Sequence, residues 1–267
     1  MPFDAHIHLD QYEPQQRADM LEAAFALGVE GVVAVSMGMD SCLETRRIAG
    51  EYSGRIIPAY GHHPEQPPLT EQELERMCAW IAGLPHEEAF AIGEVGLPYF
   101  MRHEAEAAGH PFDSVPYLRQ FEHFVRLAAT LDRPLALHAV HEDADVALDL
   151  LRHYGVRRAH FHWFKGSRAT TERLAGSGCY ISVTPEVQYD EETRDLARSY
   201  PLNRLLAETD GPWPFEGPYA GRRTEPAMVL DSVRAIAELR GLPESSVREA
   251  LKANTQRCYA SDNLLKV

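Results

Sequence analysis

Short apolar segments alternate with amphipathic ones along almost the whole chain. The apolar segments lie at residues 3–10, 31–38, 56–64, 89–97, 134–140, 158–164, 179–185 and 204–210. Apolar residues three or four positions apart, the spacing of a helix with one buried face, occur at residues 17–28, 42–52, 70–84, 115–131, 143–155, 167–178, 190–200, 226–241 and 245–260. Eight apolar segments, each followed by a helical pattern, predict a (β/α)8 TIM barrel or an open doubly wound sheet.

Polar residues at the ends of the apolar segments favour the barrel. They end six different segments and are His6 and His8, His63, Glu94, His138, His162 and Asp210. In a TIM barrel the C-terminal ends of all strands face one mouth, whereas an open sheet gathers its site near one switch point. No internal repeat or linker is visible, so we predict an α/β fold in which residues 1–267 form a single TIM-barrel domain.

Composition is that of an ordinary globular protein. Hydrophobic residues make up 45% and charged residues 25% of the 267 residues. No apolar run is long enough to span a membrane, and the first ten residues do not resemble a signal peptide, so we expect a cytoplasmic protein with no membrane association. The four cysteines, Cys42, Cys78, Cys179 and Cys258, lack C-x-x-C spacing, which predicts reduced structural thiols.

The net charge of −14 narrows the classes of ligand. A broad nucleic-acid surface relies on clustered Lys and Arg, and such an acidic chain argues against one. A small phosphate-containing ligand remains compatible, because bound cations reverse the local field. Nothing in the sequence indicates an obligate protein partner.

The first apolar segment, FDAHIHLD, carries three polar residues at alternate positions. In a strand, Asp4, His6 and His8 would share one face while the apolar residues occupy the other. A single inward histidine is more often a hydrogen-bonded core residue. Two imidazoles two positions apart instead predict metal ligands.

Later strands are predicted to add further donors. Glu94 lies in AFAIGEVGL before Gly96 and Pro98, and a buried carboxylate there needs a cation or a hydrogen-bond donor. His138 lies in PLALHAV, where small neighbours leave room for an ion.

Two segments each carry a pair of polar residues on one face. In RAHFHWFKG we expect His162, nearer the strand end, to be a ligand and His160 to be an interior histidine. In LLAETDGPW we expect Asp210 to be a ligand, while Glu208, like Asp4, could orient ligands without touching metal.

These residues together could hold two divalent cations that share a carboxylate. The predicted ligands are His6, His8, Glu94, His138, His162 and Asp210. Mixed nitrogen and oxygen donors suit Zn, Mn or Mg. The G-x-S-x-G, G-x-G-x-x-G and G-x-x-x-x-G-K-[ST] motifs are absent, which disfavours serine-hydrolase, dinucleotide and P-loop chemistry.

Several motifs in a fixed order resemble the TatD family of metal-dependent deoxyribonucleases and related hydrolases. The matching stretches are DAHIHLD at 4–10, GHHP at 61–64, IGEVGLPY at 92–99, LH at 137–138, HWFKG at 162–166, ETDGP at 208–212, GRRTEP at 221–226 and ANTQRCY at 253–259. The resemblance implies a TIM barrel with one or two divalent cations. It places His6, His8 and Asp210 at one metal and His138 and His162 at the other. Glu94 would lie between the metals, and His63 beside them to contact substrate or a product phosphate.

Two positions depart from the pattern of that family. Pro98 stands where the resemblance leads us to expect Asp, and Val140 where we expect Arg. Losing a guanidinium weakens phosphate recognition, because Arg can bind a phosphate through two hydrogen bonds. Nearby residues that could replace the lost charge are Lys165, Arg222, Arg223 and His141.

Three functions remain open from the sequence. The first is a phosphodiesterase or deoxyribonuclease, with a small phosphodiester or DNA as substrate and with Asp210, Glu94 and His63 as catalytic residues. The second is an amidohydrolase-like enzyme for a small ester, lactone or amide, and the third is a non-catalytic metal-binding barrel. The segment GPWPFEGPYAGRR at residues 211–223 could stack a base or pack against the barrel.

Overall fold

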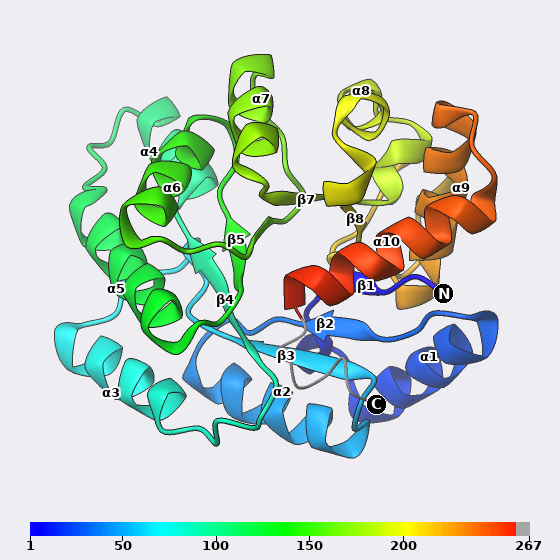
Figure 1. Ribbon diagram of the computed structural model, residues 1–267. Helices are drawn as coiled ribbons and strands as arrows, with labels where there is room; N and C mark the ends of the chain where they lie inside the picture. Colours follow the sequence, from blue (N-terminus) through cyan, green and yellow to red (C-terminus); the bar gives the residue numbers. More distant parts are fainter. Residues whose placement is uncertain (260–267) are drawn as a thin grey trace.

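Eight parallel strands form the centre of the computed structural model, which describes residues 1–259 (Figure 1). The strands are β1 (Asp4–Ile7), β2 (Val32–Ala34), β3 (Ile56–Tyr60), β4 (Ala91–Gly96), β5 (Leu135–His138), β6 (Ala159–Phe161), β7 (Tyr180–Val183) and β8 (Leu205–Ala207). Each strand pairs with the next one in the chain. Beyond β8, the Asp210 amide donates to the carbonyl of His6 at 2.9 Å, which brings the last strand end against the first. The predicted TIM barrel is therefore confirmed as a nearly closed barrel.

Helices surround these strands (Figure 1). They are α1 (Pro14–Leu27), α2 (Met39–Glu51), α3 (Glu71–Ala82), α4 (Tyr99–Ala107), α5 (Val115–Leu131), α6 (His141–Tyr154), α7 (Arg168–Ser177), α8 (Glu191–Ser199), α9 (Val229–Arg240) and α10 (Glu244–Tyr259). Their limits follow local chemistry. In α1, for example, Pro14 occupies the first turn and Gly28 ends the helix with φ of 102°. The predicted last helix extended to residue 260, which lies outside the described residues.

One helix, α4, has no counterpart in the apolar pattern of the sequence. It spans Tyr99–Ala107 and buries none of its side chains. Its large apolar residues, Tyr99, Phe100 and Met101, are consecutive, so the spacing of three or four positions by which helices are recognised is not evident in the sequence. Its position is nevertheless important, because only Leu97 and Pro98 separate it from the end of β4.

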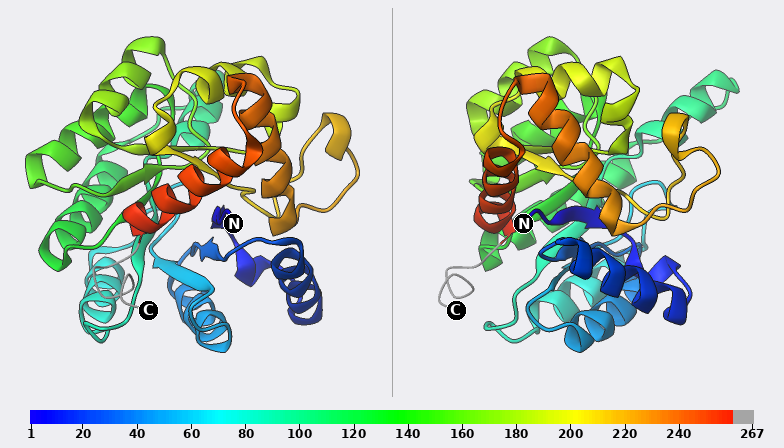
Figure 2. Two further views of the ribbon diagram at one scale, coloured as in Figure 1. Left: turned by 45° about the vertical axis from the view of Figure 1, so that its right-hand side comes forward. Right: turned by 90° about the vertical axis from the view of Figure 1, so that its right-hand side faces the viewer.

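Apolar side chains form two layers, one between the strands and the surrounding helices and one inside the barrel. Outward residues such as Leu135 and Leu137 pack with Phe121 and Phe124 of α5 in the large outer core. A smaller inner cluster consists mainly of strand residues together with two residues of α10, and it includes Ala5, Val33, Ala59, Ala136, Leu206, Cys258 and Tyr259. The right-hand view of Figure 2 shows α10 on one side of the strands, whereas α4 and residues 211–225 project from the other.

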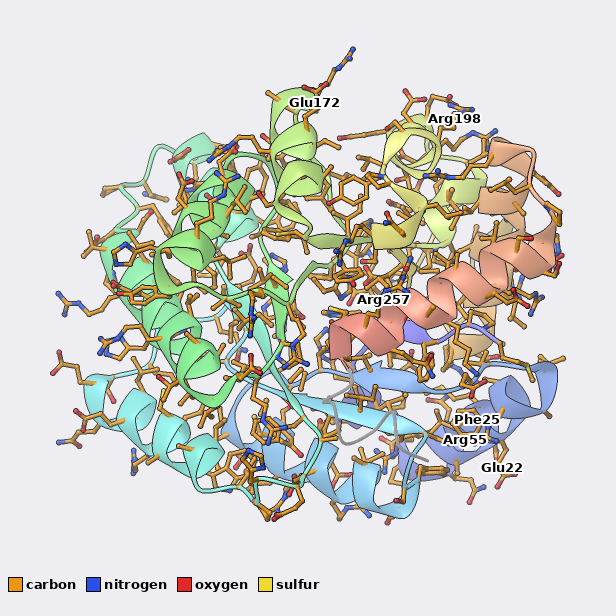
Figure 3. The ribbon with its side chains drawn as sticks, in the orientation of Figure 1. Glu22, Phe25, Arg55, Glu172, Arg198 and Arg257 are labelled. Carbon is orange, nitrogen blue, oxygen red and sulfur yellow. The ribbon has the colours of Figure 1, made fainter. Side chains whose placement is uncertain are left out.

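The outer surface carries many charged side chains. Glu172 on α7 and Arg198 on α8 lie at the periphery, and the Arg55 guanidinium lies 4.6 Å from the ring centre of Phe25 (Figure 3). All four cysteines are unpaired, and three of them, Cys42, Cys179 and Cys258, are buried. Among residues 1–259, no helix combines the length and the apolar character needed to cross a membrane.

Candidate metal centre

Glu94 on β4 lies at the centre of the polar cluster in the barrel and is fully buried. The preceding residue must be small, because a Cβ atom on Gly93 would lie 2.6 Å from Cβ of Ala136 on β5. Glycine therefore lets β4 and β5 approach closely at the level of the cluster. The two oxygens of the Glu94 carboxylate face two different sets of side chains.

The first donor group surrounds Oε2 of Glu94. It consists of that oxygen with His6, His8 and Asp210, which come from the ends of β1 and β8. Glu94 Oε2 lies 3.0 Å from His6 Nε2 and 3.3 Å from His8 Nε2. Asp210 Oδ1 lies 3.4 Å from each of the same two nitrogens.

The backbone at the end of β8 directs Asp210 toward this group. Asp210 has a left-handed conformation with φ of 48°, which Asp adopts more readily than most residues. A Cβ atom on Gly211 would lie 2.1 Å from the Tyr12 hydroxyl, so only glycine fits this turn.

The second donor group surrounds Oε1 of Glu94. It consists of that oxygen with His138 from β5 and His162 from the end of β6. Glu94 Oε1 lies 2.9 Å from His138 Nδ1 and 2.8 Å from His162 Nε2, and these two nitrogens are 3.1 Å apart. All six predicted ligands therefore meet at one place, divided between the two oxygens of Glu94.

His63 lies beside the second donor group. Its Nε2 atom is 3.1 Å from Glu94 Oε1, as close as several of the predicted ligands. Its other nitrogen, Nδ1, accepts a hydrogen bond from the backbone amide of Glu65 at 3.1 Å. In a neutral imidazole only one nitrogen accepts, so the hydrogen resides on Nε2. This tautomer makes His63 a hydrogen-bond donor in the cluster.

The spacing and chemistry of the donors fit divalent cations. Ligands at about 2.0–2.1 Å from a tetrahedral zinc ion lie about 3.3 Å from one another. Contacts in the first donor group run from 3.0 to 3.4 Å. Asp210 Oδ1 is buried and has no hydrogen-bond partner among the described residues. Bringing two carboxylates and four imidazoles together without a cation would leave buried polar atoms unsatisfied.

The carboxylates make the cluster favourable for positive charge. Burial by itself opposes the protonated form of His8, yet contacts with Asp210 and Glu94 raise its pKa to about 10. Burial likewise opposes ionisation of Glu94, but the surrounding imidazoles, His162 foremost, hold the pKa of its carboxyl well below the usual range. Glu94 is therefore an anion in a site that attracts cations.

Asp4 does not join the donor atoms around Glu94. Its carboxylate accepts hydrogen bonds from the Thr209 amide at 2.9 Å and the Thr209 hydroxyl at 2.5 Å. The pairing of β1 with β2 also shifts register between Asp4 and Ile7, so strict alternation of the side chains is broken there. Asp4 thus links β1 to the residues that follow β8.

Glu208 and His160 lie behind the second donor group. Glu208 Oε1 accepts from the Trp163 amide at 2.6 Å and lies 3.6 Å from His162 Nδ1. His160 is fully buried, with Nε2 2.7 Å from the Ser182 hydroxyl and Nδ1 2.6 Å from the Tyr259 hydroxyl. His160 therefore has the surroundings of a hydrogen-bonded interior histidine.

Glu65 is a residue of the site that the sequence patterns do not reveal. It follows the GHHP motif, and its Oε1 atom lies 3.2 Å from His138 Nε2. Its carboxylate also accepts hydrogen bonds from the amides of Phe100 and Met101, at 2.8 and 2.7 Å. A carboxylate two residues after His63, in the same loop, is the one signal for it in the sequence.

Two of the four candidate substrate contacts form ion pairs with carboxylates outside the two donor groups. Lys165 Nζ lies 3.2 Å from a Glu186 oxygen and 3.7 Å from an Asp190 oxygen. Arg223 pairs with Glu225 at 2.7 Å. Their charges are therefore already balanced by carboxylates nearby.

The other two candidate contacts lie against aromatic rings. The Arg222 guanidinium lies 5.5 Å from the ring centre of Tyr219, and the ring centre of His141 lies 4.7 Å from that of Tyr99. The structure thus brings the six predicted ligands and His63 together. Each of the four candidate substrate contacts instead has a carboxylate or an aromatic ring outside the two donor groups as its neighbour.

Val140 and Pro98 occupy the starts of two helices near the site. Val140 is the buried N-cap residue of α6, and Pro98 is the N-cap residue of α4. The guanidinium of Arg102 reaches from α4 to the first turn of α6, where it pairs with Glu142 and Asp143 at 3.0 and 2.9 Å. A cation is thus present near the start of α6, but it is held by two carboxylates.

Aromatic side chains project on the same side of the barrel as α4. Phe100 is 57% exposed, and its ring centre lies 5.9 Å from that of His138. In the segment 211–223, Phe215 and Tyr219 are buried and pack together, whereas Trp213 is 59% exposed. Phe215 and Tyr219 thus anchor a segment whose other residues are mostly exposed, and Phe100 and Trp213 remain accessible.

Comparisons with known proteins give a consistent result. Residues 3–260 match the protein family described as "TatD related DNase". An uncharacterized metal-dependent hydrolase of Haemophilus influenzae is 35% identical over 259 residues, which cover 97% of this chain and 99% of that protein. YcfH of Escherichia coli, also named an uncharacterized metal-dependent hydrolase, is 30% identical over 269 residues, which cover 97% of this chain and 96% of that protein. The crystal structure of YjjV, a TatD homolog from Escherichia coli, superimposes with a TM-score of 0.80 at 25% identity, covering 97% of this chain and 98% of that one.

Proposed function

The chain belongs to the TatD family of metal-dependent hydrolases, and from this premise we propose that it cleaves phosphodiester bonds as a deoxyribonuclease. The main support is the arrangement around Glu94, whose two oxygens each face a separate set of imidazoles. The description of the family as a DNase supports the choice of a phosphodiester over other esters.

We assign one cation to each donor group. His6, His8 and Asp210 with Glu94 Oε2 would hold the first, and His138 and His162 with Glu94 Oε1 the second. Zn, Mn and Mg all accept such nitrogen and oxygen donors. Divalent cations bound at the two groups supply Lewis acidity, which polarises the ester and makes water nucleophilic at neutral pH.

The side chains of the site have distinct tasks during hydrolysis. The Asp210 carboxylate accepts the proton of the attacking water, while its Oδ1 atom stays within the first donor group, 3.4 Å from His6 Nε2 and His8 Nε2. Water oxygen bonds to phosphorus, the bond from phosphorus to the leaving oxygen breaks, and the leaving oxygen takes up the proton that Asp210 had accepted. His63 donates a hydrogen bond from Nε2 to a phosphate oxygen, a role that its tautomer supports. Phe100, exposed beside His138, offers a face on which a base can stack.

A second candidate is hydrolysis of a small ester, lactone or amide on the same cations. It is favoured by the ion pairs that occupy the basic residues, such as Lys165 with Glu186 and Arg102 with Asp143. Guanidinium and ammonium groups already paired with carboxylates contribute little to binding a polyanion. Salt separates the two candidates, because DNA binding through phosphate contacts weakens steeply with ionic strength and binding of a neutral substrate does not.

The test is hydrolysis of bis(p-nitrophenyl) phosphate, a short single-stranded DNA and a panel of small esters. The apo protein is reconstituted separately with Zn, Mn and Mg, and Asp210→Ala serves as the inactive reference. We expect turnover of both phosphodiesters, lost in Asp210→Ala. Turnover confined to the esters would favour the second candidate, and bound metal without any turnover would indicate a non-catalytic barrel.

Two further expectations accompany the proposal. We propose that residues 1–267 act as one catalytic domain. We also propose a cytoplasmic location, because four free cysteines suit a reducing compartment. Fluorescence microscopy of a tagged chain in cells tests the second point.

A further inference from the structure

The carboxylate of Glu65 joins three parts of the molecule that are distant in sequence. It extends from the loop after β3, accepts hydrogen bonds from the first turn of α4 and reaches His138 at the end of β5. Glu65 is partly buried, with a side chain 14% exposed. No other carboxylate among the described residues contacts His138 Nε2, since Glu94 lies on the Nδ1 side.

The two nitrogens of His138 therefore face different carboxylates. Nδ1 points to Glu94 Oε1 and His162 in the second donor group, and Nε2 lies 3.2 Å from Glu65 Oε1. If Nδ1 binds a cation it carries no hydrogen, so Nε2 carries the hydrogen and donates it to Glu65. Such a bond fixes the tautomer and the ring orientation and makes the imidazole a stronger ligand.

The hydrogen bonds to α4 hold the carboxylate of Glu65 in place. Phe100 and Met101 occupy the second and third positions of α4, whose amides have no partner within the helix. An N-cap side chain commonly accepts from these amides, but Pro98 at the N-cap has no acceptor in its side chain. Glu65 takes over this role from another loop, so one side chain both caps α4 and contacts His138.

We propose that Glu65 is a positioning residue for the cation of the second donor group, and this rests on the proposed function. It acts through His138 and does not touch the reacting atoms. The arrangement also couples His138 to the end of α4 that carries the exposed ring of Phe100. Loss of the carboxylate should weaken the binding of one of the two cations and leave the affinity for the other unchanged.

The experiment compares Glu65→Gln and Glu65→Ala with the wild-type protein. Zinc stoichiometry and affinity are measured on the full chain by competition with a chromophoric chelator, and Tm is measured for the apo forms. Gln keeps one of the two oxygens that accept from the α4 amides, and it lacks the charge that faces His138. Glu73→Gln is the matched control, because Glu73 also binds a helix start, accepting from the Thr70 amide at 2.9 Å in α3.

We expect Glu65→Gln to keep a higher apo Tm than Glu65→Ala, because it retains one acceptor for α4, while one zinc ion binds about 10- to 100-fold more weakly. Glu65→Ala should show the same loss with a lower Tm, and Glu73→Gln should leave both zinc affinities unchanged. Wild-type affinity for both ions in Glu65→Gln would overturn the proposal, whether or not Glu65→Ala folds.

A His138→Ala variant separates this proposal from the proposed function. One outcome is that wild type binds two zinc ions, His138→Ala binds one, and Glu65→Gln binds two with wild-type affinity. In that case only the proposed role of Glu65 is wrong. If His138→Ala binds zinc as the wild type does, the assignment of the second donor group is itself wrong.

Discussion

The two donor groups around Glu94 are built in different ways. The first takes His6, His8 and Asp210 from the two strands that close the barrel, and the Nδ1 atoms of both histidines have no partner among the described residues. Backbone contact between the end of β8 and β1 sets the positions of these ligands, as when the Asp210 amide donates to the His6 carbonyl.

The second donor group relies on side chains outside the ligands. It takes His138 and His162 from adjacent strands. Glu65 lies 3.2 Å from His138 Nε2, within hydrogen-bond distance, whereas Glu208 lies 3.6 Å from His162 Nδ1, which also has no hydrogen-bond partner among the described residues. Such carboxylates orient the imidazoles that bind a cation. Substitutions of the residues around the ligands should therefore affect the second group more selectively, and substitutions at the β1–β8 junction the first.

Loss of the shared carboxylate should have the largest effect. Glu94→Ala removes an oxygen from both groups, and we expect turnover of bis(p-nitrophenyl) phosphate to fall at least about 10³-fold, equivalent to about 4 kcal/mol of transition-state stabilisation. Steady-state kinetics at saturating metal measure it. Turnover within tenfold of wild type would mean that Glu94 does not link the two groups.

Glu208→Gln should selectively weaken the second group. Gln retains an oxygen for the Trp163 amide but removes the charge beside His162, so we expect one cation to bind about 10- to 100-fold more weakly in a chelator competition. Glu186→Gln is the control, since Glu186 also bonds Trp163, through its indole nitrogen at 2.7 Å. Equal losses in the two variants would contradict a specific role for Glu208.

Thr209→Val should mainly affect the junction of β1 and β8. It removes the hydroxyl that donates to Asp4 and leaves a buried carboxylate oxygen without that partner, at a cost of about 1–3 kcal/mol in the free energy of unfolding. Urea unfolding of the apo protein measures the loss. Thr255→Val, which removes a hydroxyl bonded to the Leu251 carbonyl within α10, should cost less. A larger loss of unfolding free energy in Thr255→Val than in Thr209→Val would show that the junction does not depend on Asp4.

Lys165→Ala should have the smallest effect on catalysis. Because Lys165 pairs with Glu186 and Asp190, we expect less than about a threefold change in KM for single-stranded DNA, measured by steady-state kinetics. A tenfold rise in KM, reversed in Lys165→Arg, would instead identify Lys165 as a phosphate contact.

The donor groups were predictable because they depend on position along strands. Polar residues at the ends of parallel strands must meet at the mouth of a barrel, so the meeting of His6, Glu94, His138 and Asp210 follows from the alternation of apolar segments. The eight-stranded barrel itself was predictable for the same reason. The assignment of these residues as metal ligands stays a prediction that zinc titration addresses.

Other features depend on contacts that no local pattern encodes. Glu65 acquires its role from Phe100 and His138, which lie 35 and 73 positions further along the chain. The helix α4 itself buries no side chain, and its large apolar residues, Tyr99, Phe100 and Met101, are consecutive in the sequence. Asp4 shares its strand with two predicted ligands, yet it bonds to Thr209, which is 205 positions away in the sequence.

The most direct test of two donor groups is the number of zinc ions bound per chain, measured by equilibrium dialysis and elemental analysis. We expect two ions for wild type and one each for His8→Ala and His138→Ala, with the remaining ion at different donor groups. A single ion in wild type, lost completely in both variants, would contradict two donor groups that share Glu94.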